Sequence, residues 1–232
     1  MLLSVWATVC DATPQSSSAS GSPGRWRTSG GVGGHVGAPH VNRQDALAAL
    51  GNTADVESRR LGARALGDTG VMADVPILVR ALRDTDPLVR TLAEQSLWQV
   101  WSRSGDAEVD DLLARGIAQM TTGDGTSAVE TFTRVIERRP DFAEGWNKRA
   151  TIHYLMGEYR KSLADCDEVM KRNPYHFGAL SGYGLIYLRL DQPARALEYF
   201  ERALAVNPNM DQMRQTVDGL RETLMERRKN TL

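Results

Sequence analysis

Residues 112–208 repeat one pattern of apolar, small and proline positions three times. Pro140, Pro174 and Pro208 stand 34 residues apart. Twelve positions before each proline is a small residue, and eight positions before it is a larger apolar one: Ala128, Ser162, Ala196 and Phe132, Cys166, Phe200. A spacing kept over two full steps predicts a helix–turn–helix unit stacked on copies of itself.

Small residues at fixed positions explain how the two helices of each unit approach each other. Gly116, Ala150 and Gly184 fall where the first helix, helix A, must come close to the second, helix B. Phe132 and Phe200 are expected to fill the space between neighbouring repeats. Cys166 is smaller, so its neighbours must compensate for the lost volume. The prolines end helix B, because proline lacks the N–H and clashes with the preceding turn.

Helical patterns also flank the repeats. Upstream, they predict helices over residues 44–50, from Thr53 or Asp55 to Leu66, over 75–82 and over 88–102, with a break at 67–70. Downstream, residues 210–228 form one amphipathic helix, whose apolar residues fall at helical spacing: Met213, Val217, Leu220 and Leu224. This helix is expected to cover the exposed face of the last repeat.

The repeated stretch resembles the tetratricopeptide repeat, whose motif runs W-x2-L-G-x2-Y, A-x3-F and P. The third repeat matches best, through Leu180, Tyr183, Gly184, Tyr187, Ala196, Phe200 and Pro208. The other repeats depart from the motif at Arg115, Gln119, Arg149, His153 and Cys166. The resemblance implies an all-α, superhelical α-α solenoid.

The upstream helices resemble two short HEAT-type repeats. At an offset of 31, Asp55 and Arg59 align with Asp86 and Arg90, and residues 86–90 read D-P-x-V-R. In that family the Asp and Arg form a ladder between stacked repeats, which implies structural roles for these four residues. Such short repeats also occur in phycobilisome lyases, so a lyase accessory or cofactor-attachment role is the alternative function.

Four segments follow from these patterns: an arm over 1–41, HEAT-like repeats over 42–105, three repeat units over 106–209, and a capping helix and tail over 210–232. The arm is rich in Ser, Gly and Pro, and its first ten residues are apolar. A secretory signal, an organelle transit peptide and a disordered tail all remain open for it. The compartment is therefore unknown, with the cytoplasm as the default.

Trp98 and Trp101 end the upstream block. Large aromatic residues beside a junction more often seal an interface than bind a ligand. We expect them to pack this block against helix A of the first repeat, which gives one continuous superhelix.

Composition and motifs argue against catalysis. The net charge is −1 and no basic stripe follows a helix face, so a nucleic-acid partner is not expected. No segment has the roughly 20 apolar residues that span a bilayer. The sequence lacks the metal-ligand and nucleophile motifs of common enzymes, and we expect no cofactor, no metal and no enzymatic activity.

The concave groove is the candidate site. By the resemblance, helices A line it, and the partner-binding residues are Leu113, Ile117, Met120, Asn147, Thr151, Tyr154, Ser181, Leu185 and Leu188. Asn147 could hold a peptide backbone, because its amide both donates and accepts. The positions of a chaperone-type carboxylate clamp hold only one cation: Leu113, Ile117, Lys148, Gly178 and Gly182. The predicted function is a protein-interaction scaffold for a protein or peptide; self-association through the groove or the capping helix is the competing explanation.

Overall fold

The computed structural model describes residues 41–230, which form helices and turns without strands. The N-terminal block has four α-helices and a short 3-10 helix: α2 Arg43–Leu50, α3 Val56–Thr69, η1 Met72–Asp74, α4 Val75–Ala81 and α5 Pro87–Trp101. Seven further α-helices follow: α6 Ala107–Thr121, α7 Gly125–Arg138, α8 Ala143–Leu155, α9 Tyr159–Arg172, α10 Phe177–Arg189, α11 Pro193–Val206 and α12 Asp211–Lys229. The expected all-α solenoid is confirmed.

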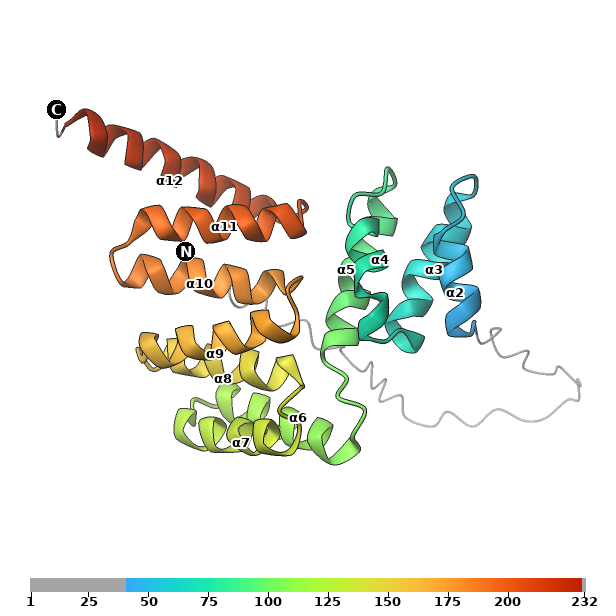
Figure 1. Cartoon of the computed structure of the whole chain (residues 1–232), viewed down its shortest axis with the longest axis horizontal. Coiled ribbons are helices and arrows are strands. Elements are labelled where there is room, and N and C mark those ends of the chain that lie inside the picture. Colours follow the sequence, from blue (N-terminus) through green and yellow to red (C-terminus); the bar gives the residue numbers. More distant parts are fainter. Residues whose placement is uncertain (1–40, 231–232) are drawn as a thin grey trace, which may run out of the picture.

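The repeat block is a stack of antiparallel helix pairs. Helices α6 and α7, α8 and α9, and α10 and α11 pair with each other, and α7–α8 and α9–α10 contacts join one pair to the next (Figure 1). Helix α12 packs on α11 through Met213 and Val217, and its C-terminal half extends beyond the stack (Figure 1). The three repeats are stacked in chain order, as the 34-residue spacing predicts.

The turns between paired helices share a left-handed residue. Gly123 and Gly157 have φ angles of 83° and 77°, which glycine adopts without steric cost. In the third repeat the equivalent position holds Asp191, with φ 54°. Aspartate tolerates this conformation better than most residues, but its Cβ still meets the following carbonyl.

Glycine on helix A makes room for the phenylalanine of helix B. A Cβ added at Gly184 would lie 2.2 Å from the Phe200 ring, and one at Gly116 would lie 2.5 Å from the Phe132 ring. Both phenylalanines are fully buried. The second repeat has Ala150 and the smaller Cys166 instead, so the extra methyl group offsets part of the lost ring volume.

Helices of the N-terminal block begin at aspartate caps. The Asp55 carboxylate accepts a hydrogen bond from the Glu57 N–H, and that of Asp86 accepts one from the Val89 N–H. The predicted break at Gly67 is wrong, because α3 continues to Thr69 and ends at Gly70. Gly67 lies inside the helix, where an added Cβ would clash with the side chain of Gln99 on α5.

Arginine–aspartate pairs join the helices of this block, in a different register from the expected ladder. Arg59 pairs with Asp84 at 2.8 Å, and Arg60 pairs with Asp86 at 2.6 Å. The guanidinium of Arg90 instead donates to the Asp84 carbonyl oxygen at 2.9 Å. These carboxylates and guanidiniums all make contacts within the block. That the block consists of HEAT-type repeats remains a prediction, as do the segment boundaries.

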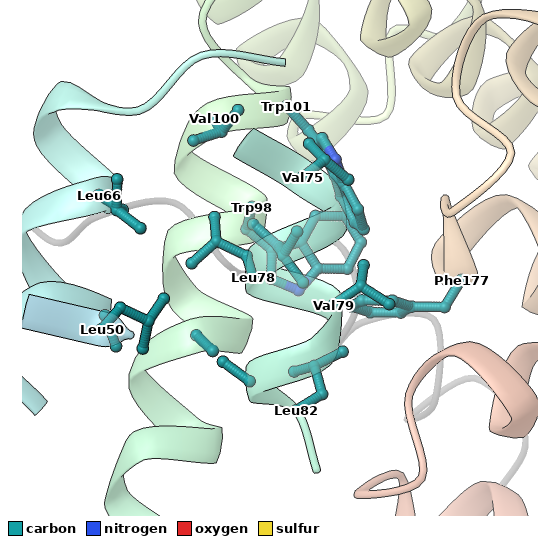
Figure 2. Packing of buried hydrophobic residues seen from close by; sticks show 14 of the residues in the cluster. Leu50, Leu66, Val75, Leu78, Val79, Leu82, Trp98, Val100, Trp101 and Phe177 are labelled. Carbon is teal, nitrogen blue, oxygen red and sulfur yellow. The ribbon is translucent and has the colours of Figure 1, made fainter. Parts of the chain in front are cut away.

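The N-terminal block docks on the third repeat, so the expected junction with the first repeat is wrong. Trp98 and Trp101 both contact Phe177 at the start of α10, with ring centroids 5.2 and 5.1 Å apart. Figure 2 shows Phe177 reaching toward Val79 of the block. The block therefore lies beside the stack rather than at its end (Figure 1).

Hydrogen bonds at the end of α11 reinforce this docking. The Arg83 guanidinium donates to the carbonyl oxygens of Ala205 and Val206, the latter at 3.2 Å. The Asn209 amide donates to the Leu82 carbonyl oxygen at 2.8 Å. Carbonyls in the last turn of a helix lack partners within it, so Arg83 caps α11 from the other block.

The targeting alternatives for the N-terminal arm concern residues 1–40, which lie outside the described residues.

Candidate binding surface

Helices α6, α8 and α10 carry the nine predicted partner-binding residues. Ile117, Met120 and Leu188 are partly exposed. The other six are buried: Leu113, Asn147, Thr151, Tyr154, Ser181 and Leu185. The accessible part of the predicted surface is thus two apolar side chains on the first repeat and one on the third, and these three residues are called the strip below.

The polar members of this surface are bonded within their own helices. The Asn147 amide donates to the Glu144 carboxylate at 3.1 Å. The hydroxyl of Thr151 donates to the Asn147 carbonyl oxygen, and that of Ser181 to the Phe177 carbonyl oxygen. A peptide that used the Asn147 amide would have to compete with the carboxylate of Glu144.

Glu144 is the centre of a buried polar network near the start of α8. Its carboxylate pairs with the Lys148 ammonium at 3.1 Å and lies 3.1 Å from Nε2 of His176. Burial alone would raise the pKa of this carboxyl, but Lys148 and His176 outweigh it and lower the pKa to about 2. Because Lys148 is engaged here, it is poorly placed for a carboxylate clamp.

His176 links this network to the N-terminal block. Its Nδ1 accepts a hydrogen bond from the Ala179 N–H at 3.0 Å and so caps α10. In the neutral ring the proton is therefore on Nε2, which donates to Glu144. The face of the His176 ring stacks on the Trp101 ring, with the two ring centroids 4.6 Å apart.

No motif in the sequence assigns this role to His176. The one local signal is its place immediately before α10, where a side-chain acceptor caps a helix. The need for glycine at Gly178, two residues later, is visible only in the fold: an added Cβ there would lie 2.8 Å from the Trp98 ring.

The apolar members of the candidate surface also contribute to the protein's own core. Leu185 and Tyr154 belong to a buried cluster that includes Met213 and Val217 of α12, and Leu188 packs against it. Leu113 lies in a separate cluster with Phe132, against which Ile117 and Met120 pack. These residues of α6, α8 and α10 therefore have a packing role in the fold.

The thiol of Cys166 is buried inside the second repeat. Burial, with Asp165 and Asp167 beside it, raises the pKa of the Cys166 thiol far above its usual value, so the thiolate nucleophile is not formed at neutral pH. Among residues 41–230, no cluster of three or more His, Cys, Asp or Glu side chains could hold a metal ion. None of the helices described is long and apolar enough to span a bilayer.

Comparison with known proteins identifies the repeat block. Models of the tetratricopeptide repeat match residues 113–176 and 177–210. A TPR repeat-containing protein of Rhizobium etli is 32% identical over 142 residues, which cover 61% of this chain and 70% of that protein. The chain belongs to the tetratricopeptide repeat family.

Other proteins match over shorter stretches of the chain. The Protein SGT1 homolog of Bos taurus is 32% identical over 84 residues, which cover 36% of this chain and 25% of that protein. Among solved structures, the Sgt2 TPR domain from Aspergillus fumigatus has a TM-score of 0.50 at 21% identity. That match covers 53% of this chain and 83% of the domain, and supports the fold.

Proposed function

We propose that this protein is a non-catalytic adaptor that binds an apolar segment of a partner protein along helices α6, α8 and α10. The observation that carries the proposal is the partly exposed apolar strip of Ile117, Met120 and Leu188 on a tetratricopeptide stack. Stacked repeats offer extended concave surfaces to their ligands, and exposed apolar patches mark interaction sites. An apolar peptide segment suits this strip better than an acidic one.

The other six predicted residues are buried, so a partner can reach them only if the helices move apart. Thr151 and Leu185 are only 3% exposed. A partner that contacts them needs the face to open, so its apparent affinity falls by the fraction of molecules that are open. We therefore propose that the strip makes the first contact, and that the buried residues follow as the helices separate.

Peptide selection tests this function. A displayed peptide library is selected on the immobilised full chain, and the dissociation constant of a recovered peptide is measured for variants. Ile117→Glu with Leu188→Glu should weaken binding at least tenfold, because two charges enter an apolar contact. Met225→Glu is the control, since Met225 is 58% exposed on α12, away from the strip. Equal affinity of a folded double variant would contradict the proposal.

Self-association is the competing use of the same strip. Sedimentation of the full chain at rising concentration distinguishes the two, because a dimer through the strip would dissociate in the double variant and persist in Met225→Glu. The comparisons do not favour the lyase accessory or cofactor-attachment role.

A further inference from the structure

The start of helix α10 is covered by side chains of the N-terminal block. His176, Phe177, Gly178 and Leu180, called the α10 face below, are all buried. Phe177 and Leu180 belong to the hydrophobic cluster of the block rather than to that of the third repeat, and Phe177 is the one labelled side chain from the repeats in Figure 2. The block therefore buries an apolar surface of α10 that is separate from the nine predicted groove residues.

Two tryptophans of α5 occupy the α10 face. Trp98 and Trp101 are three residues apart, so they lie on the same side of their helix. The Trp98 ring packs edge-on against the rings of Phe177 and His176, with ring centroids 5.2 and 5.6 Å away. An added Cβ at Gly178 would lie 2.8 Å from the Trp98 ring. The glycine thus leaves room for an indole ring that comes from another helix.

Three buried donors at the contact between the block and the repeats lack hydrogen bonds. Within residues 41–230 they are the buried side-chain polar atoms without a partner: Trp101 Nε1, Asn173 Nδ2 and Asn207 Nδ2. Asn173 and Trp101 line a cavity of about 290 Å³ between the two parts, and Asn207 follows Val206, whose carbonyl oxygen accepts from Arg83 of the block. Water satisfies such donors once the two surfaces separate, so the missing bonds favour separation.

A single short turn connects the block to the repeats. Residues 102–106 join α5 to α6, and Gly105 in this turn has a φ angle of 78°. An added Cβ at Gly105 meets no atom within 4 Å, so packing does not hold the chain at this point. A change of the backbone angles at Gly105 would move the block away from α10 while each part keeps its own core.

We propose that the N-terminal block is a detachable cover, and that the α10 face beneath it binds a partner helix with two aromatic side chains one turn apart. The block shows the chemistry of this partner, because α5 presents Trp98 and Trp101 to the same face. One aromatic ring of the partner takes the space beside Gly178, and the other stacks on His176 as Trp101 does. An amphipathic helix whose apolar side enters a hydrophobic site is a common mode of peptide recognition. The inference does not depend on the function proposed for the strip.

Hydrogen exchange of the full chain tests whether the block detaches. The indole proton of Trp101 is buried, so it exchanges with deuterium when the block opens. We expect its protection factor to be lower by about tenfold or more than that of the Phe200 amide, which lies in the core of the third repeat. Equal protection of the two protons, with both exchanging by global unfolding, would overturn the detachable cover.

Two arginines of the block provide a matched pair of variants. Arg83→Gln removes the hydrogen bonds to the carbonyl oxygens of Ala205 and Val206, so exchange of the Trp101 indole proton should become severalfold faster. Arg80 is exposed on α4, and within residues 41–230 its side chain has no hydrogen bond to the repeats. Arg80→Gln should therefore leave the exchange unchanged. Equal exchange in the two variants would contradict opening at this interface.

A synthetic peptide of residues 86–103 tests the chemistry of the partner, because it carries both tryptophans of α5. Titrated into the labelled full chain, it should cause saturable shifts at Phe177 and Gly178. Its affinity should be severalfold higher for Arg83→Gln than for the wild type, since a more open population leaves more of the α10 face free. Replacing both tryptophans of the peptide by alanine should weaken binding about tenfold or more.

Three results of this titration would overturn the proposed partner. The first is no saturable shift with Arg83→Gln, and the second is equal affinity for the alanine peptide. The third is a set of shifts confined to Ile117, Met120 and Leu188, which would assign the peptide to the strip and not to the α10 face.

Discussion

The rings of Trp101 and His176 lie nearly parallel, 19° apart in orientation, although they belong to different blocks of the chain. Trp101 ends α5 and His176 precedes α10, so their contact fixes the N-terminal block on the third repeat. The same histidine ring reaches Glu144 on α8. The docking is therefore built from residues of three separate helical pairs.

Truncation of Trp101 tests this docking. Trp101→Ala should lower the free energy of unfolding by about 3–5 kcal/mol, the usual loss for a buried aromatic residue. Leu61→Ala is the control, because Leu61 is 51% exposed on α3 and should change stability by less than about 0.5 kcal/mol. Denaturant unfolding followed by circular dichroism measures both, and similar losses for the two variants would argue against a docked block.

The contact of Gly184 with Phe200 predicts opposite effects for the same substitution at two sites. Gly184→Ala should destabilise the protein by about 1–3 kcal/mol, because the new methyl group overlaps the ring. Gly219→Ala on α12 meets no atom within 4 Å and should stabilise by roughly 0.5–1 kcal/mol. Thermal unfolding of the two variants measures these changes in stability. A stabilising Gly184→Ala would show that Gly184 and Phe200 are not closely packed.

The left-handed turn at Asp191 predicts a gain in stability. Asp191→Gly should raise the free energy of unfolding by up to about 1 kcal/mol, since glycine adopts the positive φ angle without strain. The reverse change at the equivalent turn, Gly157→Ala, should lower it by about 1 kcal/mol. Chemical denaturation of both variants against the wild type provides the test, and a loss of stability in Asp191→Gly would refute the turn equivalence.

The Glu144 network predicts a specific acid dependence. The folded-state pKa of this carboxyl is about 2, below its ordinary value of 4.5. The ionised carboxylate therefore stabilises the fold fully above about pH 4.5, and this contribution is lost as the pH falls from there toward 2. It amounts to at most about 3 kcal/mol.

Glu144→Gln provides the comparison. At pH 7 this variant should be less stable than the wild type by several kcal/mol, because the Lys148 ammonium stays buried without this carboxylate. The difference in free energy of unfolding between wild type and variant should become smaller as the pH falls from 4.5 to 2. Urea unfolding at fixed pH steps measures it. A difference that stays constant over this window would show that Glu144 does not carry the predicted linkage.

Local sequence patterns are sufficient to predict the repeats. They are not sufficient to predict how the repeats pack against the upstream helices. Helix ends follow from Asp55, Asp86 and the prolines, and the small residues on helix A follow from the repeat motif. The rings of Phe132 and Phe200 pack on the glycine of their own repeat, whereas the sequence predicts them between neighbouring repeats. The predicted break at Gly67 is wrong, because Gly67 lies inside α3. The glycine is needed there for its close contact with Gln99 on α5, not to end the helix.

Long-range contacts account for the rest. Nothing local to Trp98 or Trp101 distinguishes docking on the third repeat from docking on the first. The choice depends on Gly178 and Phe177, which become neighbours of the tryptophans only in the fold. In the candidate site, motif position predicts Ile117 and Leu188 on one surface, but does not show how deeply their neighbours are buried.

Methyl NMR of the full chain tests the adaptor role most directly. The isoleucine, leucine and methionine methyl groups are labelled, and a peptide selected on the wild type is titrated in. The account predicts saturable shifts at Ile117, Met120 and Leu188, while Leu61 and Met225 stay unmoved. A bound peptide that shifts only Leu61 or Met225, and leaves the strip unchanged, would contradict it.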